Sequence, residues 1–258
     1  MEPLFIVSPL NRSGTNFLAN LILETGEFQM PKGINEDYFS VYSDNLTRYV
    51  DSTIKHWSKP FSDPKSKEKD EILAEFGDVL LNRAKKKCVN EKRLLLKCPR
   101  PNNIENVFKL FPTAKVLFCI RNGKSTVDSF EKSFNHYTFK DIVDLWAKGC
   151  REIDKCVSRY PNAGNVLVIN YEDIVRAEHS TIEKINSFCN LTKGLSKDSI
   201  ENLPIFGSST NKNDENKLHW SPVKKTSNFD PLSRGNDWGW TKRMLYNYYT
   251  RSLNTENK

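Results

Sequence analysis

Short apolar runs alternate along this chain with segments in which apolar residues recur every three or four positions. The runs span Leu4 to Ser8, Arg93 to Lys97, Lys115 to Ile120 and Asn165 to Asn170. Each run is too short and too continuously apolar for an amphipathic helix, so we expect four buried strands.

Helical periodicity fills the segments between these runs. Leu18, Leu21 and Ile22 share one helical face after the first run. Residues 143–153 mark a longer helix through Val143, Trp146, Cys150 and Ile153. Alternating strands and helices predict an α/β fold, in which helices flank a parallel sheet and the crossovers are right-handed. Ligands bind such sheets beyond the carboxyl ends of the strands, so the chemistry is expected there.

Two segments depart from this alternation. Ser62 to Lys87 is predicted as a charged helical excursion, and Ile205 to Asn236 as a long polar loop rich in Ser, Asn and Lys. The chain of 258 residues shows no internal repeat and no separate linker. We therefore expect a single domain over residues 1–258.

The charge balance favours anionic ligands. The chain has 39 Lys and Arg residues against 32 Asp and Glu residues, a net charge of +7. This excess would attract a bisphosphorylated nucleotide, a sulfated sugar or a nucleic acid. No recognition-helix, zinc or RNA-binding signature accompanies it, so a nucleic-acid partner is not expected.

The N-terminal residues, the lengths of the apolar stretches and the cysteines indicate the cellular compartment of the protein. No basic n-region precedes the first strand, and no apolar stretch approaches the roughly 20 residues that a membrane helix needs. The six cysteines form no C-x-x-C pair. We expect no signal peptide, no membrane span, reduced and mostly buried thiols, and a cytoplasmic location.

A strand-to-helix turn follows the first strand over residues 8–16, Ser-Pro-Leu-Asn-Arg-Ser-Gly-Thr-Asn. Glycine and small hydroxyl residues at such a turn leave backbone N–H groups free to point at an anion, which predicts a phosphate site. A Walker A loop requires lysine just before its Ser or Thr, but here Gly14 directly precedes Thr15. The alternative interpretation is a simple N-capped turn with Arg12 in solvent.

A second anion site is predicted where the Lys115 to Ile120 run ends. Arg121 follows that run, and Ser129 lies eight positions later on the expected helix. A guanidinium at a strand end and a hydroxyl about two helical turns further on can converge on one phosphate. Either residue alone would more simply be a surface arginine or a helix serine.

Together these two motifs resemble the superfamily of sulfotransferases that use PAPS (3′-phosphoadenosine 5′-phosphosulfate). Arg12-Ser13-Gly14-Thr15 resembles its 5′-phosphosulfate loop, and Arg121 with Ser129 resembles its 3′-phosphate motif. Similar segments follow in the expected order between Leu4 and Leu191: Lys97-Cys98-Pro99-Arg100, Phe111-Pro112-Thr113-Ala114-Lys115 and Tyr171-Glu172-Asp173. The resemblance implies a P-loop-containing, nucleotide-binding enzyme that transfers a sulfuryl group from PAPS without a metal. A hydroxyl or amine of a carbohydrate or small molecule would accept it, and 3′,5′-bisphosphoadenosine (PAP) would be released.

The resemblance also implies roles for individual residues. It places Arg12, Ser13, Gly14, Thr15 and Asn16 at the 5′-phosphosulfate, Arg121 and Ser129 at the 3′-phosphate, Tyr171 at adenine, and, by a looser match, Arg234 and Gly235 over the 3′-phosphate. A core position is the alternative for Tyr171. The nearby Trp220, Trp238 and Trp240 are interpreted as core anchors in preference to stacking surfaces.

Neither anion-site motif contains the catalytic base. Cytosolic members carry a catalytic histidine where this chain has Pro99, so its pattern is closer to carbohydrate and tyrosylprotein members, whose glutamate follows the phosphate loop. Glu36 is then the implied base, with Asp37 or an exposed acidic turn as alternatives. Arg12 and Lys97 would stabilise the departing phosphate.

Two other functions stay open for the whole chain. One is a P-loop nucleotide or small-molecule kinase, which shares the strand-loop-helix architecture. The other is a non-catalytic module that binds nucleic acid or another anionic polymer through the same phosphate loop.

Overall fold

Parallel strands form the central sheet of the computed structural model, which describes residues 2–57, 65–89, 91–161, 164–205, 224, 232, 234–251 and 253. The four predicted strands are confirmed as β1 (Leu4–Val7), β3 (Arg93–Cys98), β4 (Lys115–Ile120) and β5 (Val166–Asn170). A fifth strand, β2 (Phe28–Gln29), was not predicted. Two residues are too few to show a periodicity, and only their pairing with β3 defines them as a strand.

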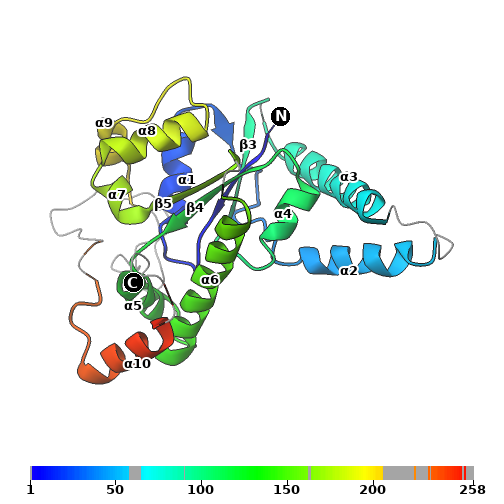
Figure 1. Cartoon of the computed structure of the whole chain (residues 1–258). Coiled ribbons are helices and arrows are strands. Elements are labelled where there is room, and N and C mark those ends of the chain that lie inside the picture. Colours follow the sequence, from blue (N-terminus) through cyan, green and yellow to red (C-terminus); the bar gives the residue numbers. More distant parts are fainter. Residues whose placement is uncertain are drawn as a thin grey trace.

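The order of strands in the sheet is β2-β3-β1-β4-β5 (Figure 1). β1 is therefore central, with Ile6 beside Lys97 of β3 on one side and beside Leu117 of β4 on the other. Because all these pairs are parallel, the carboxyl ends of β1, β3 and β4 meet at one edge of the sheet. The predicted α/β fold with a helix-flanked parallel sheet is confirmed.

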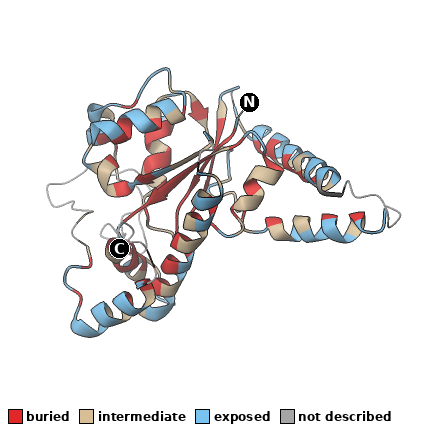
Figure 2. Ribbon diagram, viewed as in Figure 1, coloured by how far each residue is buried: buried red, intermediate tan, exposed pale blue. Residues whose placement is uncertain are grey.

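Helices cover both faces of the sheet. Alternate residues of β1 point to opposite faces, and each set packs against its own layer of helices. Leu4 and Ile6 pack with α1 (Thr15–Leu23), α7 (Tyr171–Val175), α8 (His179–Phe188) and α9 (Lys197–Asn202). Phe5 and Val7 pack with α2 (Ser43–Ile54), α3 (Lys65–Lys85), α4 (Glu105–Leu110) and α6 (Phe139–Arg159). β1, β3 and β4 are accordingly buried between two helical layers (Figure 2). The prediction of a buried strand is wrong for β5, which lies at the edge of the sheet with only Ile169 buried. α3 confirms the predicted charged helix.

The carboxyl-terminal helix α10 (Trp240–Thr250) packs near α5 (Gly123–Ser133) and against α6 (Figure 1). Tyr246 lies in a third cluster with Trp146, and the Nε1 of Trp238 donates to Asp128 Oδ1 at 3.4 Å. Trp238 is thus the core anchor that was predicted. The same prediction is wrong for Trp240, the first residue of α10, which is 74% exposed. Trp220 lies outside the described residues, as does most of the predicted loop from Ile205 to Asn236.

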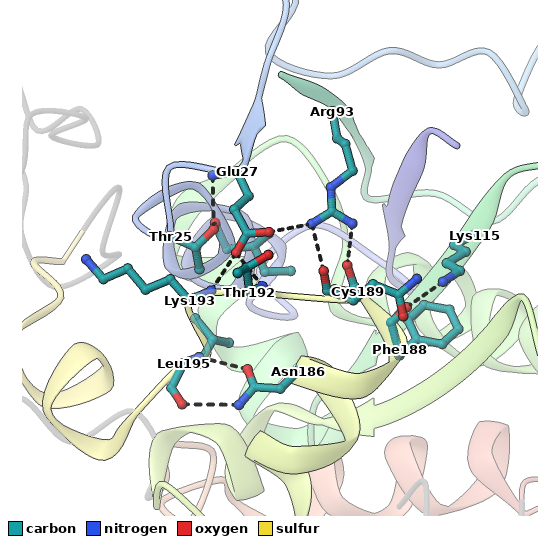
Figure 3. A network of polar contacts seen from close by, with 12 residues as sticks. Thr25, Glu27, Arg93, Lys115, Asn186, Phe188, Cys189, Thr192, Lys193 and Leu195 are labelled. Atoms are coloured by element: carbon teal, nitrogen blue, oxygen red, sulfur yellow. Dashed lines mark hydrogen bonds and ion pairs between the residues drawn. The ribbon is translucent and has the colours of Figure 1, made fainter. Parts of the chain in front are cut away.

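A polar network ties the β2 end of the sheet to the segment that follows α8 (Figure 3). The carboxylate of Glu27 accepts hydrogen bonds from the backbone N–H groups of Thr192 and Lys193 and forms an ion pair with Arg93 at 3.0 Å. Arg93 also donates to the carbonyl of Cys189. The partly buried carboxylate of Glu27 therefore joins two segments that are more than 160 positions apart in the sequence.

The described residues include no helix long and apolar enough to cross a membrane. All six cysteines are free, and all but Cys88 are buried.

Candidate active site

The turn after β1 is shaped by its own serines. Ser8 Oγ donates to the Leu10 carbonyl at 3.0 Å, and Ser13 Oγ donates to the same carbonyl at 2.8 Å. Both hydroxyls are buried, so they hold the backbone of the turn instead of facing a ligand. Ser13 can serve an anion at this site only through its backbone N–H.

Gly14 sets the direction of the first amides of α1. It occupies the N-cap position with φ 96°, and no side chain caps the helix there. An uncapped helix start leaves backbone N–H groups without intrahelical partners, and the helix dipole favours negative charge at that point. By contrast, Asn122 caps α5 by accepting from Ser125 N. The α1 start is therefore the better placed of the two for a phosphate.

Only glycine fits at position 14. A Cβ built there would lie 2.2 Å from Cδ2 of Tyr171, and the positive φ disfavours any L side chain. Tyr171 is the first residue of α7 and is buried; its ring also contacts Phe17 edge-on at 5.8 Å. Tyr171 therefore packs against the turn at Gly14, and the guanidinium carbon of Arg121 lies over its ring, 4.9 Å from the centroid.

Three arginines from distant parts of the chain lie close together, and two of them donate to the buried hydroxyl of Ser129. Arg12 Nε donates to Ser129 Oγ at 3.2 Å, and Arg234 Nη1 donates to the same oxygen at 3.1 Å. Arg121 Nη1 donates to the carbonyl of Arg12 at 3.0 Å. Burial, together with the charges of Arg234 and Arg121, lowers the pKa of Arg12 to about 10. A multiply charged anion bound here would relieve this mutual repulsion.

The carboxyl-terminal segment completes this arginine cluster, by which we mean Arg12, Arg121, Ser129 and Arg234. Gly235 has φ 80°, and a Cβ there would lie 2.9 Å from the carbonyl oxygen of Lys124. Ser125 Oγ donates to the carbonyl of Arg234 at 3.3 Å. Close contact with the start of α5 holds the segment in place, so the loosely matched Arg234 and Gly235 do lie beside Arg121 and Ser129.

Lys97 occupies the other side of the α1 start. Its side chain is buried at the end of β3, and Nζ donates to Oδ1 of Asn16. Burial lowers the pKa of Lys97. The amine is therefore directed at the first turn of α1, where the sequence predicted the 5′-phosphosulfate.

A cavity of about 670 Å³ opens next to Lys97. It is lined by Asn16, Ala19, Asn20, Met30, Asn35, Glu36, Tyr38 and Lys97. Four of these side chains are uncharged and can hydrogen-bond, two are apolar, and one amine and one carboxylate complete the lining. The cavity is thus suited to a polar molecule placed next to whatever occupies the α1 start.

Glu36 and Asp37 have different surroundings. Glu36 lines the cavity and accepts a hydrogen bond from the hydroxyl of Tyr38. Asp37 Oδ1 accepts from Phe39 N at 2.8 Å, its backbone N–H donates to the Lys97 carbonyl, and Oδ2 is buried without a hydrogen-bond partner in the described part of the chain. Burial raises the pKa of Asp37 to about 6. Of the two carboxylates, Glu36 is the one that faces the cavity.

Sequence reasoning missed part of this site. Tyr38, Asn20 and Asn35 line the cavity, yet none belongs to a recognisable motif. The sequence offers one signal for Tyr38, which directly follows the acidic pair Glu36-Asp37. The structure adds a second, because its φ of 53° is unusual for a non-glycine residue. The pairing of Arg12 with Ser129 was also not anticipated, because the motif assigned Arg12 to the other phosphate site.

Comparison with solved structures supports the fold assignment. The sulfotransferase domain of the Synechococcus PCC 7002 olefin synthase is 15% identical, with a TM-score of 0.57, and the match covers 98% of this chain and 96% of that one. A sulfotransferase domain from the curacin biosynthetic pathway is also 15% identical, with a TM-score of 0.51 and coverage of 78% and 77%. At this identity the likeness shows the fold alone.

Comparison with curated proteins found no match. The model of the sulfotransferase family, however, matches residues 3–194, which include β1 to β5, the turn after β1 and the Arg121–Ser129 motif. That stretch is well over half of the 258 residues. The chain therefore belongs to the sulfotransferase family of enzymes, as its two anion-site motifs predict.

Proposed function

We propose that this sulfotransferase uses PAPS as donor and transfers its sulfuryl group to a hydroxyl or amine of a carbohydrate or small-molecule acceptor, releasing PAP. The arginine cluster is the observation that supports this donor. Arg12 and Arg234 donate to Ser129, and Arg121 donates to the Arg12 carbonyl, so three cations gather where the 3′-phosphate is predicted. A nucleotide with phosphates at both the 5′ and 3′ positions matches this cluster and the α1 start, whereas ADP and ATP have no 3′-phosphate.

In the proposed mechanism the acceptor oxygen attacks sulfur in line with the bond to the 5′-phosphate. The new O–S bond forms as the bridging S–O bond breaks, and the acceptor proton passes to the Glu36 carboxylate. Lys97 and the first amides of α1 stabilise the charge that grows on the departing phosphate. Arg12 would act between the two phosphate sites, because its backbone belongs to the turn after β1 and its guanidinium to the arginine cluster.

Thermal unfolding with and without nucleotide tests the donor. We expect PAP to raise the unfolding temperature in the absence of magnesium, and ADP to raise it far less, because only PAP has a phosphate for the arginine cluster. Equal stabilisation by ADP with Mg²⁺ would instead favour the kinase alternative.

Arg121→Ala tests the position of the second anion site. Loss of a charge-assisted contact should weaken PAP binding by about 10- to 150-fold and leave ADP binding almost unchanged. Isothermal titration measures both affinities. Arg83→Ala, at an exposed position on α3, is the matched control and should change neither. If Arg121→Ala retains the preference for PAP over ADP, the 3′-phosphate does not bind at this cluster.

We also propose a reducing compartment such as the cytoplasm. Six free thiols, with the pKa values of Cys98, Cys119, Cys150, Cys156 and Cys189 raised by burial, are in keeping with thiols that stay protonated and unreactive.

A further inference from the structure

A line of exposed tyrosines leads away from the cavity that contains Glu36. Tyr38 lines the cavity, and the centroid of its ring lies 6.4 Å from that of Tyr42 at the start of α2. Tyr42 is 64% exposed and Tyr49, further along α2, is 62% exposed. We call Tyr42 and Tyr49 the tyrosine track. Large aromatic side chains this exposed bury little area of their own, so they are available to a ligand.

The track has the geometry of an extended binding surface. Tyr42 and Tyr49 are seven residues apart, which places them on the same side of α2 and about 10.5 Å apart along its axis. Asn45 is exposed between them. Val50 and Ile54, on a face of α2 turned roughly 100° from the tyrosines, anchor the helix in the core. The helix leads outward from the body of the protein beside α3, with much of its surface exposed (Figures 1 and 2).

The track is also close to electrically neutral. Asp44 pairs with Arg48 on α2 at 2.9 Å, and Asp51 pairs with Lys69 of α3. The surface therefore presents two exposed rings beside charges that neutralise each other. The cavity adds the amides of Asn16, Asn20 and Asn35 next to one amine, Lys97, and one carboxylate, Glu36. Sugars suit such a surface, because their C–H faces stack on aromatic rings and their hydroxyls exchange hydrogen bonds with amides.

We propose that the acceptor is an uncharged oligosaccharide whose reacting residue enters the cavity at Glu36 while further residues stack on Tyr42 and Tyr49. The part of this proposal that places the reacting residue at Glu36 rests on the proposed function. Binding along the tyrosine track does not, so the two can be tested separately.

The test is binding to immobilised neutral oligosaccharides, graded from monosaccharides to hexasaccharides, in the presence of PAP. We expect the wild-type protein to bind the longer oligosaccharides most strongly. The double variant Tyr42→Ala/Tyr49→Ala should bind them at least about tenfold more weakly and bind monosaccharides as the wild type does. Tyr248→Ala is the matched control, because Tyr248 is 58% exposed on α10, outside the cavity lining and the track. It should bind like the wild type.

Several results would overturn the proposal. It is wrong if the wild type binds no oligosaccharide while PAP still raises its unfolding temperature, or if the double variant binds as the wild type does. It is also wrong if the tyrosines mediate self-association, seen as a dimer in light scattering that the double variant abolishes. Equal unfolding temperatures for all variants check that the substitutions leave the fold intact. Failure of PAP to bind would count against the proposed donor and leave the track to be judged by the oligosaccharide data.

Discussion

At Gly14 the backbone passes so close to Tyr171 that a single added carbon would collide with the ring. The same residue turns the first amides of α1 outward with a left-handed φ. The nucleotide site therefore depends on a glycine for two separate reasons, space and backbone conformation.

Gly14→Ala should consequently reduce both stability and PAP binding. We expect a loss of about 2 to 4 kcal/mol in the free energy of unfolding, the sum of backbone strain and overpacking. Urea unfolding measures it. Gly33→Ala is the control, because Gly33 also has a positive φ, 79°, but nothing lies within 4 Å of its added Cβ. If both variants lose the same amount, backbone strain alone explains the effect and the Tyr171 contact contributes nothing.

Glu36 is the residue on which the proposed proton transfer depends. Glu36→Gln keeps the size of the side chain and removes its basicity, so turnover should fall by about two to four orders of magnitude while PAP affinity stays nearly unchanged. A steady-state transfer assay with a competent acceptor measures turnover, and titration measures affinity. Normal turnover in this variant would exclude Glu36 as the base.

Asp37→Asn is the matched control for Glu36→Gln. Because burial raises the pKa of Asp37 to about 6, folding favours its protonated form, and its contribution to stability declines as pH rises from its ordinary value of 3.8 through 6. Asparagine stays neutral, so the variant should be at least as stable as the wild type at about pH 7 and keep most of its turnover. If Asp37→Asn abolishes turnover and Glu36→Gln does not, the base is Asp37.

The elements around the site are held by side chains that link their ends. Asn122 caps α5, whereas no side chain caps α1, so of these two helix starts that of α1 is the better placed for an anionic ligand. At the β2 end of the sheet, Glu27 performs the linking role for the segment after α8. Although burial acts to raise it, the amides of Lys193 and Thr192 and the charge of Arg93 keep the pKa of Glu27 below its ordinary value.

Glu27→Gln should therefore destabilise the protein at neutral pH by about 1 to 3 kcal/mol. A lowered pKa means that the carboxylate contributes its stability above the unfolded pKa and loses it as pH falls through the folded value. The difference between variant and wild type should shrink as pH falls below 4.5, the ordinary pKa of the group, as measured by chemical unfolding across a pH series. Glu24→Gln, an exposed glutamate at the end of α1, should have no such effect. A difference that persists in acid would point to packing instead of charge.

At the scale of the whole molecule, the arginine cluster brings together residues from both ends of the chain. Arg12 is 117 positions from Ser129, and Ser129 is 105 positions from Arg234. The sheet order places β1 beside β4, which brings Arg12 and Arg121 together, and the packing of Trp238 on Asp128 returns the carboxyl-terminal segment to α5. An anion site of this kind exists only in the complete fold.

The sequence alone determined the parts of this protein that depend on neighbouring residues. Continuous apolar runs identified β1, β3 and β4 because strands that are buried on both faces require apolar residues at most positions. A similar run identified β5, although this strand lies at the edge of the sheet and is only partly buried. The Arg12 to Thr15 turn and the spacing of Arg121 and Ser129 were recognisable because their chemistry is local to one strand end or one helix.

Only the tertiary structure decided which side chains meet. It paired Arg12 with Ser129, directed Lys97 at Asn16 and turned Glu36 toward the cavity while burying part of Asp37. It also left Trp240 exposed and buried Trp238, although a single residue separates them in the sequence. The physical reason is common to all of these: the direction of a side chain on a turn is set by packing and charge from segments far away in the sequence, which no local pattern records.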